Sequence, residues 1–402
     1  MRNTRLVLVL AVAVCAVIIA VLLLRRDDRG IRHPTSGAGG TSNVVQSAAV
    51  VAHHVEGAPE WEDASAERVA TRLATQISDS ELVRLEPGHP KPAHITRAQE
   101  EGARARITFL VVDDRGRPVP DATVAGGFYN HGRGDHSFSR QTRSDGTVEL
   151  EDLCVWEINY HVEKPGYYET RDRYDFYKIG FDCVKNGRWI PWNPTVEVVL
   201  KRKINPIAMY VRRGKLNRVA LPKLDDWTGF DLECSDWLQP YGNGKREDFQ
   251  VFFRRGETNH MGVFNQFSLS FRFCKPFDGA YLSHKDNTGS QLQCVYEADT
   301  NRLYDTKMEF SYERLTDLAN GRVVVNNKLL GEEEYLVLRV RSESDADGRL
   351  IKANYAKICP PLFAAFYGFQ MTTYFNPNEN DPNLEADTSR NLLNPSDLGF
   401  AP

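Results

Sequence analysis

The sequence predicts a mainly β chain that begins with a transmembrane helix. Leu6–Leu24 contains no charge, proline or strongly polar residue. At 1.5 Å per residue this run is long enough to cross a bilayer core of about 30 Å. Aromatic residues are plentiful, the 29 glycines and 20 prolines are spread along the chain, and long helical patterns are scarce. We therefore expect an N-terminal transmembrane helix, a short helical stalk and two β-sandwich-like domains.

The apolar run is predicted to remain in the chain as a membrane anchor, residues 1–26. A cleavable signal peptide would have a shorter apolar region ending in a small-x-small site. Here the run ends in leucines followed by Arg25 and Arg26, and bulky Val14 before Cys15 argues against a lipoprotein signal. Basic residues flank both ends, so the positive-inside rule does not set the orientation. The short N-terminus favours a signal anchor of the inner (cytoplasmic) membrane, single-pass, with the body periplasmic or extracellular.

The formal net charge of −4 over 402 residues gives no general attraction to nucleic acid. The expected partners are the membrane, through residues 6–24, and an envelope protein or a glycan. Residues 27–58 are rich in Asp, Gly, Ser and Ala and are predicted to form a disordered linker, because they cannot bury enough apolar surface to fold.

Residues 59–102 are predicted to form a helical stalk and a Pro-rich connector. From Trp61 to about Leu85, apolar side chains recur every four residues, as at Val69 and Leu73. The prolines between positions 87 and 92 should end this helix, because proline cannot continue it.

Residues 103–204 are predicted to form the first β domain. Ile107, Phe109 and Val111 alternate with residues of the opposite face, as in a strand. Three segments in order resemble carboxypeptidase regulatory-like domains, and a plausible last strand follows them: 116–124, 144–150 and 164–168, then 195–200. The resemblance implies a prealbumin-like β-sandwich without catalytic residues of its own. The insertion 171–192 departs from the family pattern.

Residues 205–402 are predicted to form a second β domain of uncharacterised type. Leu336, Leu338 and Val340 lie on one strand face, and the tight turn 345–348 should lead into a return strand. Four segments resemble a family of uncharacterised exported bacterial proteins: 229–245, 267–279, 353–358 and 374–387. This resemblance implies an architecture and no chemistry.

The strongest candidate site is an acidic cluster interleaved with two tryptophans. It consists of Asp225, Asp226, Asp231, Glu233 and Asp236, with Trp227 and Trp237. Paired carboxylates beside aromatic rings can hydrolyse a glycoside or bind a sugar or calcium. The alternative is a solvated loop held to the core by its tryptophans. A hydrolase requires two carboxyls facing one cleft, a sugar-binding face requires exposed coplanar aromatics, and a scaffold predicts both tryptophans buried.

Calcium is the one cofactor that the sequence suggests. Asn378, Asp381 and Glu385 supply oxygen ligands within a short segment. Asn, Asp and Pro at this density are also ordinary turn formers, so the alternative is a turn without metal and a chain without cofactor.

Six cysteines lie beyond the anchor: Cys154, Cys183, Cys234, Cys274, Cys294 and Cys359. Their even number in an exported chain permits disulfides. Free buried cysteines are the alternative, because cysteine also serves as a small core residue.

The chain contains no Gly-x-Ser-x-Gly, His-Glu-x-x-His, P-loop or dinucleotide motif. The sequence therefore favours a non-catalytic interaction or scaffolding role at the cell envelope. The alternatives are a carbohydrate-binding surface module and a glycosidase-like hydrolase that uses carboxylates near 225–236.

Overall fold

The computed structural model describes residues 82–88, 90–134, 136–213, 222–256, 266–286, 288–317, 322–365 and 368–393. The chain divides into two units, Met1–Asp63 and Ala64–Pro402, and every described residue belongs to the second. The predicted anchor, the linker and most of the predicted stalk lie outside the described residues. Among the residues described, no helix is long and apolar enough to span a membrane.

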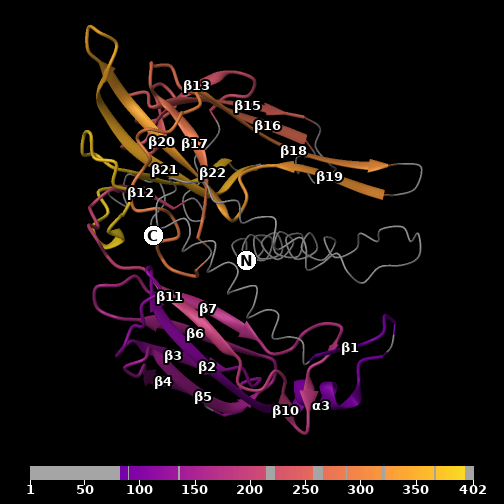
Figure 1. Cartoon of the computed structure of the whole chain (residues 1–402). Helices are drawn as coiled ribbons and strands as arrows, with labels where there is room; N and C mark the ends of the chain where they lie inside the picture. The colour runs from indigo at the N-terminus through magenta and orange to yellow at the C-terminus, as the bar shows by residue number, and fades with distance from the viewer. Residues whose placement is uncertain are drawn as a thin grey trace, which may run out of the picture. The chain divides into compact units, whose positions relative to one another are not determined.

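The described part of the chain is mainly β, as predicted (Figure 1). A first β region builds three sheets: sheet 1 in the order β11-β2-β10-β9 with β5 beside β2, sheet 2 in the order β4-β3-β6-β7, and a two-stranded sheet that includes β8. Its strands are β2 (Ala103–Asp113), β3 (Thr123–Phe128), β4 (Ser137–Gln141), β5 (Thr147–Cys154), β6 (Glu157–Glu163), β7 (Thr170–Asp175), β8 (Phe181–Asp182), β9 (Val184–Lys185), β10 (Arg188–Trp189) and β11 (Thr195–Leu200).

Strand β2 shows why these residues form a sheet. Ile107, Phe109 and Val111 are fully buried, as their alternation predicts, while Arg104 and Arg106 point away from the core. Residues of sheets 1 and 2 pack into one hydrophobic cluster. The predicted last strand is confirmed as β11, which pairs in parallel with β2.

The predicted helix from Trp61 does not extend to Leu85. Instead, β1 (Val83–Arg84) is a strand that pairs with β8, and the Leu85 amide donates a hydrogen bond to the Gly180 carbonyl. The connector, in turn, contains the one α-helix of the described residues, α3 (Ala93–Glu101), which buries Ile95 and Ala98. Hydrophobic periodicity does not predict β1, because this strand depends on pairing with β8, which is distant in the sequence. It does not predict α3 either, because the buried apolar stripe of this helix consists of two residues only.

A second β region builds two antiparallel sheets, sheet 3 in the order β12-β22-β21-β20-β17 and sheet 4 in the order β14-β13-β15-β16-β18-β19. The elements are β12 (Tyr210–Arg212), β13 (Trp227–Asp231), β14 (Asp236–Trp237), β15 (Phe249–Arg255), β16 (Gln266–Arg272), β17 (Gly279–His284), β18 (Lys307–Asp317), β19 (Arg322–Lys328), β20 (Glu334–Ser344), β21 (Leu350–Ala365), β22 (Gly368–Phe375) and the 3-10 turn η2 (Thr388–Arg390).

Sheets 3 and 4 differ in how much of their surface is buried. One face of sheet 3 packs against the inner face of sheet 4 and forms a hydrophobic cluster with it. The opposite face of sheet 3 contributes Tyr335, Val337 and Tyr355 to a separate hydrophobic cluster. Strand β20 is accordingly buried at nearly every position, whereas β15 and β16 alternate between buried and partly exposed residues. The outer face of sheet 4 is therefore accessible to solvent.

Candidate functional site

Strand register divides the two tryptophans of the predicted site between opposite faces of sheet 4. Phe230 pairs directly with Trp237, and residues directly opposite in an antiparallel pair share a face. Trp237 is 2 % exposed and belongs to the core. Trp227 lies three residues before Phe230, so it points to the outer face, where its register partner is Phe252.

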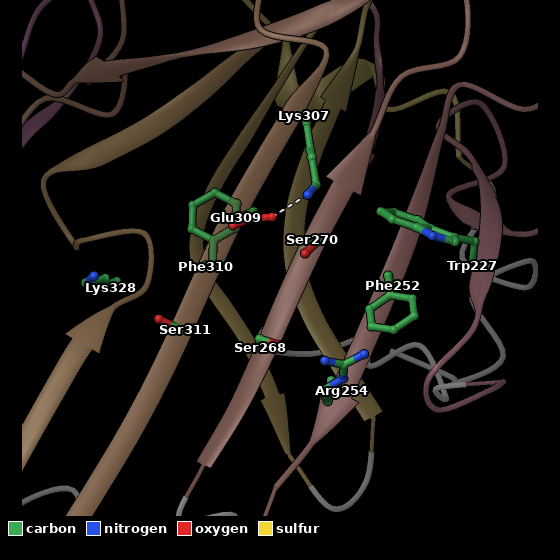
Figure 2. Close-up of a pocket in the computed structure, with 10 residues that line it drawn as sticks. All are labelled: Trp227, Phe252, Arg254, Ser268, Ser270, Lys307, Glu309, Phe310, Ser311 and Lys328. Carbon is green, nitrogen blue, oxygen red and sulfur yellow. Dashed lines mark ion pairs between the residues drawn. The ribbon is translucent and has the colours of Figure 1, made fainter.

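The outer face of sheet 4 forms a groove of about 540 Å³ (Figure 2). Two rows of side chains cross the strands, because register places these residues opposite one another. The first row is Trp227, Phe252, Ser270 and Glu309, and the second is Arg254, Ser268, Ser311 and Lys328. Small serine side chains occupy the middle of these rows and larger side chains occupy their ends, so the outer face of the sheet is concave.

Aromatic rings and cations form one wall of this groove. The Trp227 and Phe252 ring centroids lie 5.3 Å apart, with their planes inclined by 48°, so the pair is not coplanar. The Arg272 guanidinium lies 4.2 Å from the Trp227 ring centroid, and that of Arg254 lies 5.3 Å from the Phe252 centroid. The Arg254 side chain also contacts Asp225 at 3.3 Å.

The groove carries more positive than negative charge. Its lining includes Arg254, Lys307 and Lys328 but a single acid, Glu309, which pairs with Lys307 at 2.5 Å. A second hollow of about 470 Å³ continues from it and shares Arg254 and Lys328. Because Glu309 pairs with Lys307 and Asp225 contacts Arg254, Lys328 is the lining cation that a bound anion would meet without a carboxylate partner among the described residues.

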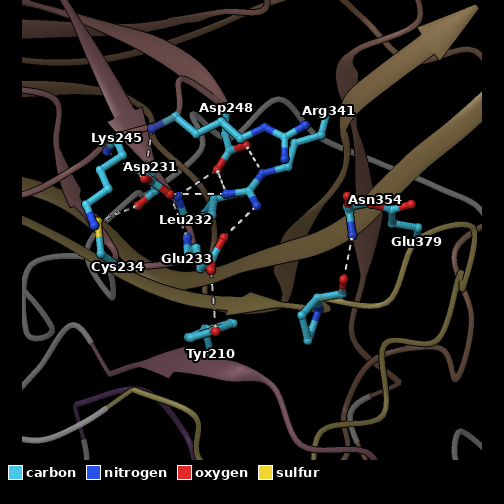
Figure 3. Close-up of polar contacts among 12 residues, drawn as sticks. Tyr210, Asp231, Leu232, Glu233, Cys234, Lys245, Asp248, Arg341, Asn354 and Glu379 are labelled. Atoms are coloured by element: carbon cyan, nitrogen blue, oxygen red, sulfur yellow. Dashed lines mark hydrogen bonds and ion pairs between the residues drawn. The ribbon is translucent and has the colours of Figure 1, made fainter.

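Two members of the predicted acidic cluster, Asp231 and Glu233, lie away from the groove and surround Arg341 together with Asp248 (Figure 3). The Arg341 guanidinium donates through Nε to Asp248 at 2.7 Å, through Nη1 to Glu233 at 2.7 Å and through Nη2 to Asp231 at 3.1 Å. Asp231 and Asp248 are almost fully buried. Sequence reasoning missed Asp248 and Arg341, which lie 93 residues apart and show no local motif.

The carboxylates of this cluster are engaged in local backbone contacts. Asp231 accepts hydrogen bonds from the amides of Glu233, Lys245 and Arg246. Asp236 accepts from the amides of Trp237 and Asn243. These contacts hold the turn that follows β13. Asp226, by contrast, forms an exposed pair with Lys223 at 2.9 Å.

The three residues proposed for calcium are also held by protein groups. The Asn378 side chain donates to Asp381 at 3.3 Å. The Glu385 carboxylate accepts from the Tyr168 hydroxyl at 3.0 Å and from the amides of Ile204 and Asn205 at 2.9 and 2.6 Å. No group of three or more His, Cys, Asp or Glu side chains in the described part of the chain could hold a metal ion.

The six cysteines beyond the anchor are free thiols in the structure: Cys154, Cys183, Cys234, Cys274, Cys294 and Cys359. Cys154, Cys183 and Cys294 are buried, which fits the role of small core residues. Burial raises the pKa of the Cys154 thiol to about 12.

No family model and no curated protein matches the chain. Among solved structures, the chain is similar to a hydroxyquinol 1,2-dioxygenase from Pseudomonas putida DLL-E4, with 13% identity, a TM-score of 0.20, and coverage of 25% of this chain and 57% of the enzyme. It is also similar to a 3-chlorocatechol 1,2-dioxygenase from Rhodococcus opacus 1CP, with 12% identity, a TM-score of 0.22, and coverage of 48% and 97%.

A third similar structure is the dioxygenase domain of a dioxygenase carbohydrate-binding protein fusion from Streptomyces sp. SirexAA-E, with 14% identity, a TM-score of 0.21, and coverage of 30% and 94%. The chain spans little more than half the length of the hydroxyquinol enzyme.

Proposed function

We propose that this chain is a membrane-anchored, non-catalytic binding protein of the cell envelope, and that the groove of sheet 4 binds an acidic glycan. The observation that carries the proposal is the pair Trp227 and Phe252, which lines a hollow on a solvent-accessible sheet face. Large aromatic side chains on a strand normally point into the core, as Phe230 does. Such a pair, partly exposed beside serines and cations, suits a ligand that is apolar on one face and polar at its edges.

A pyranose ring has those properties. Its C–H face can lie against the negative face of an aromatic ring, and its hydroxyls can exchange hydrogen bonds with Ser268, Ser270 and Ser311. Because the two rings are inclined by 48°, they suit two successive sugars of a twisted chain rather than one flat surface. Arg254 and Lys328 add a preference for carboxylate groups.

The acidic cluster supports the non-catalytic interpretation. A glycosidase needs one carboxyl to protonate the leaving group and a second to activate water or attack the sugar. Asp231 and Asp248 are instead buried against Arg341, and Asp236 binds backbone amides. The hydrolase is therefore the weaker proposal for this chain.

The remaining expectations form part of the same proposal. Residues 6–24 would anchor the chain in the inner membrane, with the body outside the cytoplasm. The first β region would be a carboxypeptidase regulatory-like β-sandwich, and the second a sandwich that carries the groove. The packing of two sheets around one core in each region supports this arrangement.

The test is binding of the full-length chain, in detergent, to an array of neutral and uronic-acid-containing oligosaccharides. We expect binding to acidic glycans, and a loss of at least tenfold in affinity for Trp227→Ala, because truncating a central aromatic anchor costs about 2 kcal/mol or more. Trp192→Ala is the matched control. Trp192 is also partly buried under an arginine, with the Arg188 guanidinium 4.7 Å from its ring centroid, but it lies in the first β region.

Binding by the Trp227→Ala variant equal to that of the parent would refute the groove as the site. Absence of binding to every glycan would refute the carbohydrate ligand. Lys328→Ala separates the two parts of the proposal, because it should weaken binding to acidic glycans and leave binding to neutral ones unchanged.

A further inference from the structure

Lys357 is a buried amine with unusual neighbours. It lies on β21, is 4 % exposed, and its Nζ lies 2.8 Å from the Cys294 sulfur and 2.8 Å from the Leu384 carbonyl oxygen. The ring centroid of Tyr374 is 4.5 Å from the same nitrogen. Among the described residues no carboxylate pairs with it.

A buried ammonium group requires a compensating negative charge. The carbonyl oxygen offers only a partial charge, and the Cys294 sulfur is the ionisable group that lies at hydrogen-bond distance from Nζ. Although burial acts to lower the pKa of Lys357, the charge of Cys294 beside it raises that pKa above its usual value. The Lys357 amine thus lies at hydrogen-bond distance from the Cys294 sulfur, and thiolate sulfur is the form of cysteine that peroxides oxidise.

Two other buried or partly buried cysteines lie in different environments. Burial raises the pKa of the nearby Cys359 thiol to about 11, although Lys357 acts to lower it. The sulfur of Cys154 faces a carbonyl oxygen, that of Glu157, at 3.1 Å rather than an amine. Cys294 is 5 % exposed, and the next residue along the chain, Val295, is 40 % exposed, so the Cys294 side of the pair lies close to the surface.

We propose that Cys294 and Lys357 form an oxidation site at which hydrogen peroxide joins Sγ to Nζ through one bridging oxygen atom. An oxygen bonded to both atoms would span about the separation that the structure shows. This inference is independent of the groove and of its ligand.

The reaction balances with two molecules of peroxide. The thiolate attacks one peroxide, whose O–O bond breaks, giving a sulfenic acid and a hydroxide, which takes the extra proton of the Lys357 ammonium and leaves as water. The neutral amine then attacks the second peroxide and gives a hydroxylamine and water. Condensation of the hydroxylamine with the sulfenic acid forms the N–O–S bridge and releases a third water. The nitrogen keeps one hydrogen, and four electrons pass to the two peroxides.

The bridge would reinforce a loop that contacts the first β region. The Cys294 carbonyl accepts a hydrogen bond from Lys201 Nζ at 2.8 Å, and Lys201 also pairs with Asp286 at 2.6 Å. Lys201 directly follows β11, whereas Lys357 belongs to β21. Oxidation would therefore link the loop that contains Asp286 and Cys294 covalently to β21 of sheet 3.

The test is mass spectrometry of the full-length chain, in detergent, before and after treatment with hydrogen peroxide. We expect the intact mass to rise by about 14 Da, one oxygen gained and two hydrogens lost, and dithiothreitol to reverse the change. Trypsin should then release residues 286–302 joined to residues 353–390, since a modified Lys357 is no longer cleaved.

Three variants make the result specific. Cys294→Ala and Lys357→Met should abolish the joined peptide, whereas Cys359→Ser should retain it. A loss of about 2 Da that requires Cys359 would indicate a disulfide and overturn the proposal. It would also be overturned by a gain of about 32 Da on Cys294 with Lys357 still cleaved, or by an unchanged mass.

Discussion

Arg341 has a backbone conformation and a set of partners that few arginines share. Its φ of 59° lies in the left-handed region, and it stands beside a register shift between β20 and β21. Such an irregularity redirects a side chain, and here it accompanies a guanidinium buried against Asp248 and Asp231. The backbone strain is compensated by four hydrogen bonds from this one side chain to three carboxylates.

We expect Arg341→Met to lower the free energy of unfolding by about 3–5 kcal/mol, because it leaves Asp231 and Asp248 buried without their cation. Chemical denaturation of the full-length chain measures this value. The control is Arg390→Met, which breaks an exposed pair with Asp387 and should change the free energy by less than about 1 kcal/mol. Equal effects of the two variants would contradict the structural role of Arg341.

For single residues, the sequence indicated that the acidic side chains of the candidate site lie close together, but not how they are arranged. The residues Asp231, Glu233 and Asp236 do gather around one turn. The sequence could not show that Trp227 and Trp237 face opposite ways, because strand parity depends on where β13 ends and β14 begins. Nor could it show Arg341, whose contact with Asp231 spans 110 residues.

Among the elements, the β20–β21 hairpin was the most predictable. The turn at Asp345 and Gly348 forms as expected, with the Gly348 amide bonded to the Asp345 carbonyl and a Gly348 φ of 77°. The groove was not predictable in the same way. It requires β13, β15, β16, β18 and β19 to lie side by side (Figure 1), and pairing between distant strands leaves no local pattern.

The strand β19 is the edge of sheet 4 and displays Val323, Val324 and Val325, each more than 40 % exposed. An apolar edge strand offers unpaired backbone groups to another chain. We expect Val324→Lys to slow aggregation of the heated chain, measured by light scattering, without lowering the melting temperature. Leu303→Lys is the control, because Leu303 is 81 % exposed but lies outside any strand. An equal benefit from both variants would show that overall charge, rather than the edge, controls aggregation.

On the scale of the whole molecule, the two β regions share buried polar contacts. Tyr168 of the first region lies in a hydrophobic cluster of the second and donates to Glu385. Backbone bonds link Arg171 to Gly289 and Gln291 to Glu169. Nothing local in the sequence indicates this junction, because the Asn, Asp and Pro residues at 376–387 are also ordinary turn formers.

Glu385 is the centre of that junction, and its removal should separate the unfolding of the two regions. The carboxylate is 1 % exposed and accepts three hydrogen bonds, so Glu385→Ala leaves one hydroxyl and two amides without their acceptor, each at about 1–3 kcal/mol. In differential scanning calorimetry we expect one transition for the parent and two resolved transitions for this variant, because regions that lose their coupling unfold independently. Glu379→Ala removes an exposed carboxylate that pairs with Lys352, and it should keep a single transition. Two transitions in the parent, or one unshifted transition in Glu385→Ala, would show that the junction does not couple the regions.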